Sequence, residues 1–264
     1  MSWPRNHWRT SLPVLHERGY LIPAINTADV DYERCAELLR ESILDHHAHA
    51  HVTIVTGDQL PEGDLGGFAN DAQLWRVTPY RQTIKLEADM IAAGPIDHWW
   101  TLFENRDVVI SVGARDFYDQ ATTYRGYRKI FDENDLPDVY NAITYWRLST
   151  HAREFFDLVR SIFLNWRQYR ELLRFPDDEA TTDVVYAMAA RIMGTETVTL
   201  PPGLGPRIAH MKPGIVPVRG QDWTRELIWE IDPLRINTVA QWGLVHYNIK
   251  SWADRYQNER RRDH

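Results

Sequence analysis

The sequence has very little cysteine and no long apolar segment. Its single cysteine, Cys35, excludes an intramolecular disulfide and a zinc site built from several thiolates of this chain. No run of about 18 apolar residues is present to span a bilayer, and residues 1–12 are polar and tryptophan-rich where a signal peptide would be apolar. We therefore expect a cytoplasmic protein without a membrane partner.

The chain also lacks an excess of basic residues. It has 30 Lys and Arg residues against 37 Asp and Glu residues, and its net charge of −7 makes the molecule as a whole repel nucleic acid. Any contact with DNA would need a local basic patch. With 264 residues, of which 44% are hydrophobic and 25% charged, the composition is that of a folded protein with room for a sizeable core.

Aromatic residues, in contrast, are abundant. The chain has 11 Trp, 12 Tyr and 8 Phe residues. Amphipathic rings stack on sugars and bases as well as filling cores, so both interpretations remain open for the Trp residues in polar contexts. These are Trp3, Trp8, Trp75, Trp223 and Trp252.

Short β-branched runs alternate with amphipathic segments in the first half of the chain. Residues 19–25 and 51–56 predict strands, and the apolar spacing over residues 31–46 predicts a helix with Asp31 as its N-cap. This βαβ opening is typical of an α/β fold. Further segments predict strands at 81–86, 107–112, 139–146 and within 225–247, and helices at 96–103, 150–173 and 183–193.

Two other segments are strongly polar. Residues 115–135 interleave Tyr with Arg and Lys, which predicts a substrate-facing insertion outside the core. Residues 256–264 are charged, which predicts a frayed end.

An acidic pair follows the strand predicted at 81–86. Alternation along a strand places Glu87 and Asp89 on one side, where both carboxylates could reach one cation. Mg²⁺ or Mn²⁺ that also holds phosphate oxygens needs only one or two protein carboxylates. The pair therefore indicates a diphosphate-binding site, although a solvated strand end has the same pattern.

Together with the βαβ opening and a downstream His-x-Lys-Pro loop, residues 78–90 (TPYRQTIKLEADM) resemble the approach strand and Asp-x-Asp motif of GT-A glycosyltransferases. The resemblance covers about residues 20–215 and is closest to phage-encoded sugar transferases and glycogenin-like retaining enzymes. It implies an α/β fold with a Rossmann-like mixed central sheet flanked by helices, in a single domain. The implied segments are an N-terminal extension (1–18), a nucleotide-binding part (about 19–112), an acceptor part (about 113–250) and a charged C-terminal tail (251–264).

The resemblance also implies site residues. The metal ligands would be Asp89, Glu87 and His210, with Glu87 standing where Asp is usual. Contacts to the nucleotide and diphosphate are implied for Asn26, Thr27, Asp31, Tyr32, Arg81, Glu87 and Lys212. Asn141 would approach the sugar, and Asp183 would orient or stabilise the oxocarbenium-like centre, although Asp183 is also a candidate helix N-cap.

The implied activity is metal-dependent transfer of a hexosyl or pentosyl group from a nucleoside-diphosphate sugar, with a UDP-sugar as the expected donor and Mn²⁺ or Mg²⁺ as the cation. Retention and inversion both remain open. The expected acceptor is a hydroxymethylated pyrimidine in phage DNA, inside the bacterial host. Its basic contacts would come from Arg125, Arg128, Lys129 and residues 260–262. A phage structural protein or a glycan is the alternative acceptor, and a carbohydrate-binding module is the alternative function.

Overall fold

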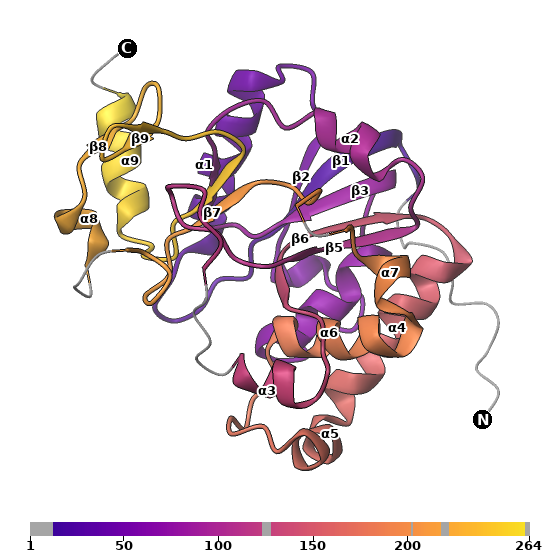
Figure 1. Cartoon of the computed structure of the whole chain (residues 1–264). Helices are drawn as coiled ribbons and strands as arrows, with labels where there is room; N and C mark the ends of the chain where they lie inside the picture. The colour runs from indigo at the N-terminus through magenta and orange to yellow at the C-terminus, as the bar shows by residue number, and fades with distance from the viewer. Residues whose placement is uncertain (1–12, 123–127, 202, 218–221, 262–264) are drawn as a thin grey trace.

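The computed structural model describes residues 13–122, 128–201, 203–217 and 222–261, and these fold around a central mixed sheet. Its strands are β1 (His16–Pro23), β2 (Val52–Val55), β3 (Tyr80–Leu86), β5 (Val108–Val112) and β6 (Val139–Arg147). The strand order is β2-β1-β3-β6-β5 (Figure 1). β1 is parallel to β2 and β3, whereas β6 is antiparallel to β3 and β5. The α/β class with a mixed central sheet is thus confirmed.

Helices cover both faces of this sheet. α1 (Tyr32–His46) packs on one face, and α4 (Thr150–Leu164) and α6 (Thr182–Met193) pack on the other with the 3₁₀ segment η2 (Gly67–Arg76) (Figure 1). Each face has its own apolar cluster. The remaining elements of this part are η1 (Gly57–Gln59), α2 (His98–Phe103), α3 (Lys129–Glu133), α5 (Trp166–Leu173) and α7 (Thr195–Val198). None of the helices in the described residues has the length and apolarity needed to cross a membrane.

The helix boundaries follow local chemistry. Asp31 caps α1 as predicted, because its carboxylate accepts a hydrogen bond from the Arg34 N–H at 3.0 Å. The helix predicted over 150–173 is instead divided at Asn165 into α4 and α5. The Asn165 side chain donates to the Ser161 carbonyl at 2.8 Å, a local bond that competes with the helical ladder.

A second, smaller sheet stands beside the central one. It consists of β4 (Met90–Ala92), β11 (Leu244–His246) and β7 (Ile208–His210), in that order. β11 is antiparallel to β4 and parallel to β7. Because β3 ends at Leu86 and β4 begins at Met90, residues 87–89 form the crossing between the two sheets.

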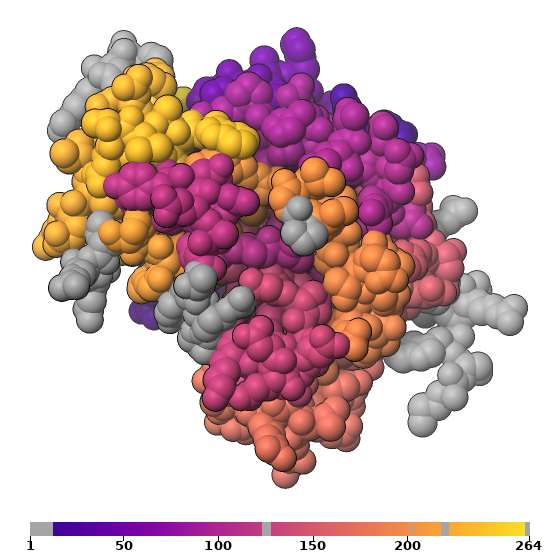
Figure 2. Space-filling view, in the orientation of Figure 1, coloured from indigo at the N-terminus to yellow at the C-terminus, as the bar shows by residue number. Residues whose placement is uncertain are grey.

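Residues 256–260, predicted to be frayed, are helical, while residues 262–264 of that predicted end lie outside the described residues. The part of the chain from residue 222 to residue 261 is well structured. It forms α8 (Trp223–Glu226), the small sheet of β8 (Trp229–Glu230), β9 (Arg235–Ile236) and β10 (Val239–Ala240), and α9 (Trp252–Arg260). Trp252 is 1% exposed and its ring contacts those of Trp229 and Tyr247 at centroid distances of 4.6 and 5.1 Å. The charged residues of α9 instead reach α1, where Arg34 pairs with Asp254. Figure 2 shows the yellow C-terminal atoms directly beside the purple N-terminal surface.

The aromatic core under α9 gives a first prediction. Trp252→Ala will lower the free energy of unfolding by about 3–5 kcal/mol, because it empties a fully buried volume among other rings. Urea unfolding monitored by circular dichroism measures the loss. Leu172→Ala is the control, since Leu172 is 74% exposed and its truncation should change the free energy by less than about 0.5 kcal/mol. Equal, small effects of both substitutions would contradict the packing of α9.

Candidate functional site

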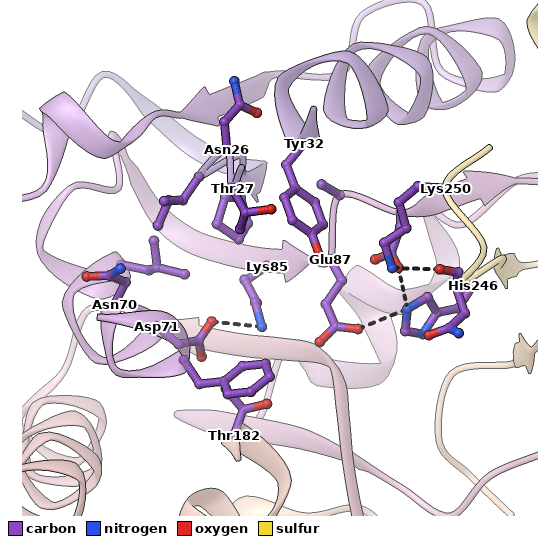
Figure 3. A pocket seen from close by; sticks show the side chains of 18 of the residues that line it. Asn26, Thr27, Tyr32, Asn70, Asp71, Lys85, Glu87, Thr182, His246 and Lys250 are labelled. Carbon is purple, nitrogen blue, oxygen red and sulfur yellow. Dashed lines mark hydrogen bonds and ion pairs between the residues drawn. The ribbon is translucent and has the colours of Figure 1, made fainter. Parts of the chain in front are cut away.

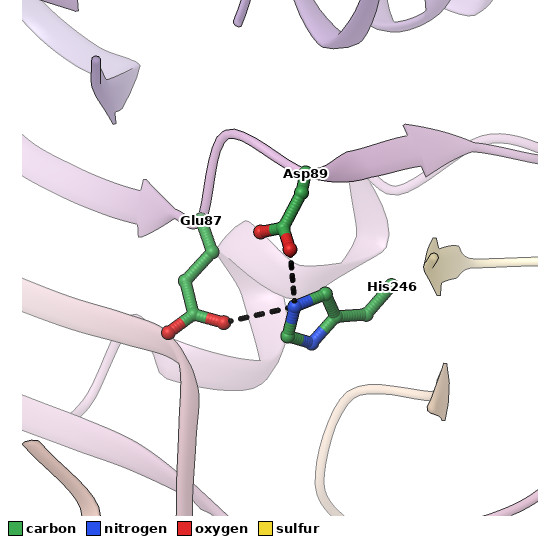
Figure 4. Close-up of side chains that lie close together, drawn as sticks. All are labelled: Glu87, Asp89 and His246. Atoms are coloured by element: carbon green, nitrogen blue, oxygen red, sulfur yellow. Dashed lines mark ion pairs between the residues drawn. The ribbon is translucent and has the colours of Figure 1, made fainter. Parts of the chain in front are cut away.

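Two carboxylates and one imidazole meet at the crossing between the sheets (Figure 4). The register of β4 and β11 pairs Met90 with His246, and the Tyr247 N–H donates to the Asp89 carbonyl at 3.0 Å. This register brings the end of β11 beside residues 87–89. The His246 Nε2 atom lies 3.3 Å from a Glu87 carboxylate oxygen and 3.1 Å from an Asp89 carboxylate oxygen.

The groups around Asp89 favour the ionised form of its carboxyl group. Burial alone would raise the pKa of Asp89, but the charges and hydrogen bonds of His246 and Lys250 outweigh burial and hold that pKa well below its usual value. The Lys250 Nζ atom donates to Asp89 at 2.5 Å and to the Asn248 carbonyl at 2.8 Å. Carboxylate oxygens with one imidazole nitrogen, all within 4.8 Å, form a donor set that fits a divalent cation. Glu87, Asp89 and His246 could therefore hold one.

The cluster forms one wall of a pocket of about 560 Å³ (Figure 3). The pocket brings together six of the residues predicted from sequence: Asn26, Thr27, Tyr32, Glu87, Asp89 and Lys212. It adds further polar residues that were not predicted, among them Asp71, Lys85, Thr182, His246, Asn248 and Lys250. Among the described residues, five carboxylates and three ammonium groups line it. The lining alone therefore has an excess of negative charge that a divalent cation would balance.

His246, rather than His210, stands beside the two carboxylates. The parallel register of β11 and β7 aligns His246 with His210, so His210 lies one strand further away. Its ring packs against Tyr140 at a centroid distance of 3.9 Å, and its side chain does not line the pocket. Burial, followed by the charge of the His246 imidazole, lowers the pKa of His210 well below its usual value, so this ring is neutral.

Two residues predicted to contact the nucleotide lie outside the pocket lining. The Asp31 carboxylate is used as the cap of α1. Arg81 lies at the opposite end of β3 from Glu87, is exposed, and pairs with Glu17 at 3.2 Å. Strand position explains the second case, because Arg81 and Glu87 are six residues apart on an extended chain, roughly 20 Å.

Asn141 and Asp183 are buried together behind the pocket. The Asp183 carboxylate accepts hydrogen bonds from the Asn141 backbone N–H and the Arg128 guanidinium, both at 2.7 Å. Thr181, not Asp183, caps α6, and the next residue, Thr182, lines the pocket. Asp183 is thus held by other protein groups and is not a pocket-lining residue.

The polar segment 115–135 is only partly the exposed insertion that was predicted. Phe117 is fully buried and Arg128 is 5% exposed, with its guanidinium also over the Tyr140 ring at 4.7 Å. Residues 123–127, which include Arg125, lie outside the described residues. Arg128 therefore stabilises the interior and is not a surface contact for DNA.

Comparison with known proteins agrees with this architecture. No protein-family model matches the chain, and no curated protein matches its sequence. The solved structure of galactosyltransferase LgtC in complex with donor and acceptor sugar analogs matches with a TM-score of 0.50, 10% identity, and coverage of 91% of this chain and 94% of that chain. The chain therefore has the fold of the GT-A glycosyltransferases, as predicted.

Two further structures match with lower TM-scores. Mouse xyloside xylosyltransferase 1 has a TM-score of 0.48 at 11% identity, covering 89% of this chain and 98% of that chain. A glycosyltransferase involved in glycosylation of the major capsid of PBCV-1 has a TM-score of 0.47 at 11% identity, covering 92% and 99%.

A signal for His246 was present in the sequence. Residues 244–246 end an apolar run with His, and Lys250 follows four residues later, much as Lys212 follows His210. Both segments are strand ends followed by a lysine-bearing loop. Only the pairing with β4 distinguishes them, and that pairing is long-range.

The buried guanidinium yields a prediction for the wall behind the pocket. Arg128→Ala will destabilise the fold by about 3–5 kcal/mol, because it removes a buried guanidinium that pairs with the Asp183 carboxylate. Thermal or urea unfolding measures the change. Its neighbour Lys129, whose side chain is 77% exposed, is the control, and Lys129→Ala should have little effect. If Arg128→Ala were as stable as the control, Arg128 would have to be assigned to the surface.

Proposed function

We propose that the protein is a metal-dependent glycosyltransferase that transfers a hexosyl or pentosyl group from a nucleoside-diphosphate sugar, a UDP-sugar, to an acceptor hydroxyl. The observation that carries the proposal is the cluster of Glu87, Asp89 and His246 in the wall of a pocket that also presents Lys212 and Lys250. The GT-A fold supports it, since LgtC, which matches over most of both chains, was solved with donor and acceptor sugar analogs.

The pocket suits departure of a diphosphate. Glycosyl transfer breaks the bond between the sugar and the diphosphate, and negative charge develops on the leaving group. A divalent cation held by Glu87, Asp89 and His246 would supply Lewis-acid neutralisation of that charge. Lys250 has three N–H donors, and two of them have protein acceptors within the described residues. The third is the one we assign to a phosphate oxygen. Lys212, held over the Tyr140 ring at 4.7 Å, adds a second ammonium group.

The nucleoside end of the pocket is built at the start of α1. The Asn26 side chain donates to the Glu33 carboxylate at 2.9 Å and accepts from the Glu33 N–H at 3.0 Å, which fixes the turn after β1. Tyr32 in the first turn of α1 presents a half-buried ring to the pocket. An aromatic face beside a fixed polar turn can stack on a base while the turn contacts the ribose.

The acceptor of the proposed transfer is a hydroxyl group. Among the basic residues expected to contact DNA, Arg128 is buried, while Lys129 and Arg260 pair with Glu133 and Asp45. The pocket itself requires only an acceptor with a free hydroxyl. Hydroxymethylated pyrimidine DNA is the first acceptor to assay, and a protein or glycan hydroxyl is the second.

The donor can be tested before the acceptor is known. A UDP-sugar with Mn²⁺ will raise the melting temperature, because a ligand at about 100 times its Kd stabilises the native state by ~2.7 kcal/mol. For a domain of this size this corresponds to roughly 5–10 °C. The measurement is a thermal-shift screen of UDP-, GDP- and TDP-sugars with Mn²⁺ or with chelator.

Variants at the cluster separate the enzyme from a binding module. Asp89→Asn and His246→Ala should abolish the Mn²⁺-dependent shift, whereas His49→Ala, at an exposed histidine outside the pocket, should retain it. A metal-independent shift that survives both cluster variants would instead indicate a carbohydrate-binding module. The absence of a shift with every donor and Mn²⁺ would contradict the proposed function.

A further inference from the structure

A buried ion pair forms a second charged feature of the pocket, apart from the carboxylate and histidine cluster. The Lys85 Nζ atom on β3 lies 2.9 Å from an Asp71 carboxylate oxygen on η2, and the two side chains are 3% and 10% exposed. Both residues line the pocket, and Figure 3 shows their charged ends directed toward each other beside Thr182. Each side chain thus places its charged end against the oppositely charged end of the other.

A buried ion pair of this kind adds little to the net stability of a fold. Desolvating two charges costs several kcal/mol, and well-packed apolar residues often serve as well. The pair is nevertheless held rigidly, because the Tyr186 hydroxyl on α6 donates to the second Asp71 carboxylate oxygen. Burial, with the charge of Asp71, raises the pKa of Tyr186 well above its usual value, so this hydroxyl keeps its proton.

The pair retains unused hydrogen-bonding capacity. A carboxylate can accept about four hydrogen bonds and an ammonium group can donate three. In the described part of the chain, Asp71 accepts from Lys85 and Tyr186, and Lys85 donates to Asp71. The remaining acceptor and donor positions are next to the pocket, where a ligand that offers hydroxyl groups can satisfy both kinds.

The positions of the pair, the cluster and the nucleoside end of the pocket indicate which part of the donor the pair would contact. Lys85 lies near the end of β3, Glu87 follows that end two residues later, and both line the pocket, so along an extended backbone the two residues are roughly 7 Å apart. The nucleoside end of the pocket, at Asn26 and Tyr32, belongs to the turn after β1 and the start of α1. Asp71 and Lys85 line the same pocket but belong to neither of these two groups. With the nucleoside at Asn26 and Tyr32 and a diphosphate at the cluster, the pair is available for the sugar.

The charge around the pair limits the kind of sugar. Two more carboxylates line the pocket on the η2 side: Asp64 accepts from Asn70, the neighbour of Asp71, and Glu179 lies against Gly67 at the start of η2. Three carboxylates thus surround this end against the single ammonium of Lys85. A sugar carboxylate placed here would meet like charge, whereas neutral hydroxyl groups would find acceptors.

We propose that Asp71 and Lys85 form the sugar subsite of the donor pocket, binding the hydroxyl groups of a neutral hexose or pentose and disfavouring uronic acids. This inference rests on the proposed function. Tyr186 is a positioning residue for Asp71 within the subsite.

The test compares nucleotides that differ only in the sugar. Affinities for UDP, UDP-glucose, UDP-galactose and UDP-glucuronate are measured with Mn²⁺ by calorimetry on the full chain. Asp71→Asn keeps the side-chain shape. It should raise the Kd of whichever neutral donor binds more tightly, UDP-glucose or UDP-galactose, by about tenfold, while changing the Kd of UDP by less than about twofold. Asp178→Asn, at an exposed residue that does not line the pocket, is the matched control and should change neither.

The possible outcomes distinguish a failure of the proposed sugar subsite from a failure of the proposed function. Equal weakening of UDP and UDP-sugar by Asp71→Asn, or no weakening of either, would overturn the subsite while leaving the proposed function intact. If Asp71→Asn fails to fold, the wild-type chain decides, since UDP-glucuronate should bind about tenfold more weakly than the neutral sugar and equal binding would overturn the inference. If the wild-type chain binds neither UDP nor any of the UDP-sugars in the presence of Mn²⁺, the proposed function is contradicted, and the subsite with it.

Discussion

The register between β4 and β11 is the constraint on which the site depends. It sets His246 opposite Met90, and therefore beside Asp89, across a crossing of three residues between two sheets. A shift of one residue would turn every side chain of β11 to the other face and remove the imidazole from the carboxylates. The crossing supplies both carboxylates, and a strand more than 150 residues later supplies the imidazole.

Charge balance explains why this arrangement tolerates buried carboxylates. Lys250 neutralises Asp89 directly, and Lys85 neutralises Asp71 elsewhere in the pocket lining. Arg128 does the same for Asp183 behind the wall, so that residue needs no ligand for its compensation. Compensated carboxylates can stay ionised in a partly dry pocket. Those with unused acceptor positions are then the ones able to bind a cation or hydroxyl groups.

Sequence reasoning recovered the local features and missed the long-range ones. The α/β pattern, the cap at Asp31 and the position of Glu87 and Asp89 at a strand end all follow from periodicity and side-chain chemistry within a few residues. The choice between His210 and His246 depends on strand pairing across the molecule, which no local spacing encodes. Polarity alone also misplaced Arg128, because a charged side chain can be buried when a distant partner such as Asp183 meets it.

The abundance of tryptophan has its explanation in the same long-range geometry. Trp75, Trp223 and Trp252 are buried, so these residues fill cores and are not stacking surfaces. Tyr247 and Trp252 flank the segment that carries Lys250, and their rings are packed together. A lysine on an irregular loop can hold a fixed position beside Asp89 only if the chain on both sides is anchored. The aromatic cluster under α9 provides that anchor, and it makes the C-terminal helix a structural requirement of the pocket.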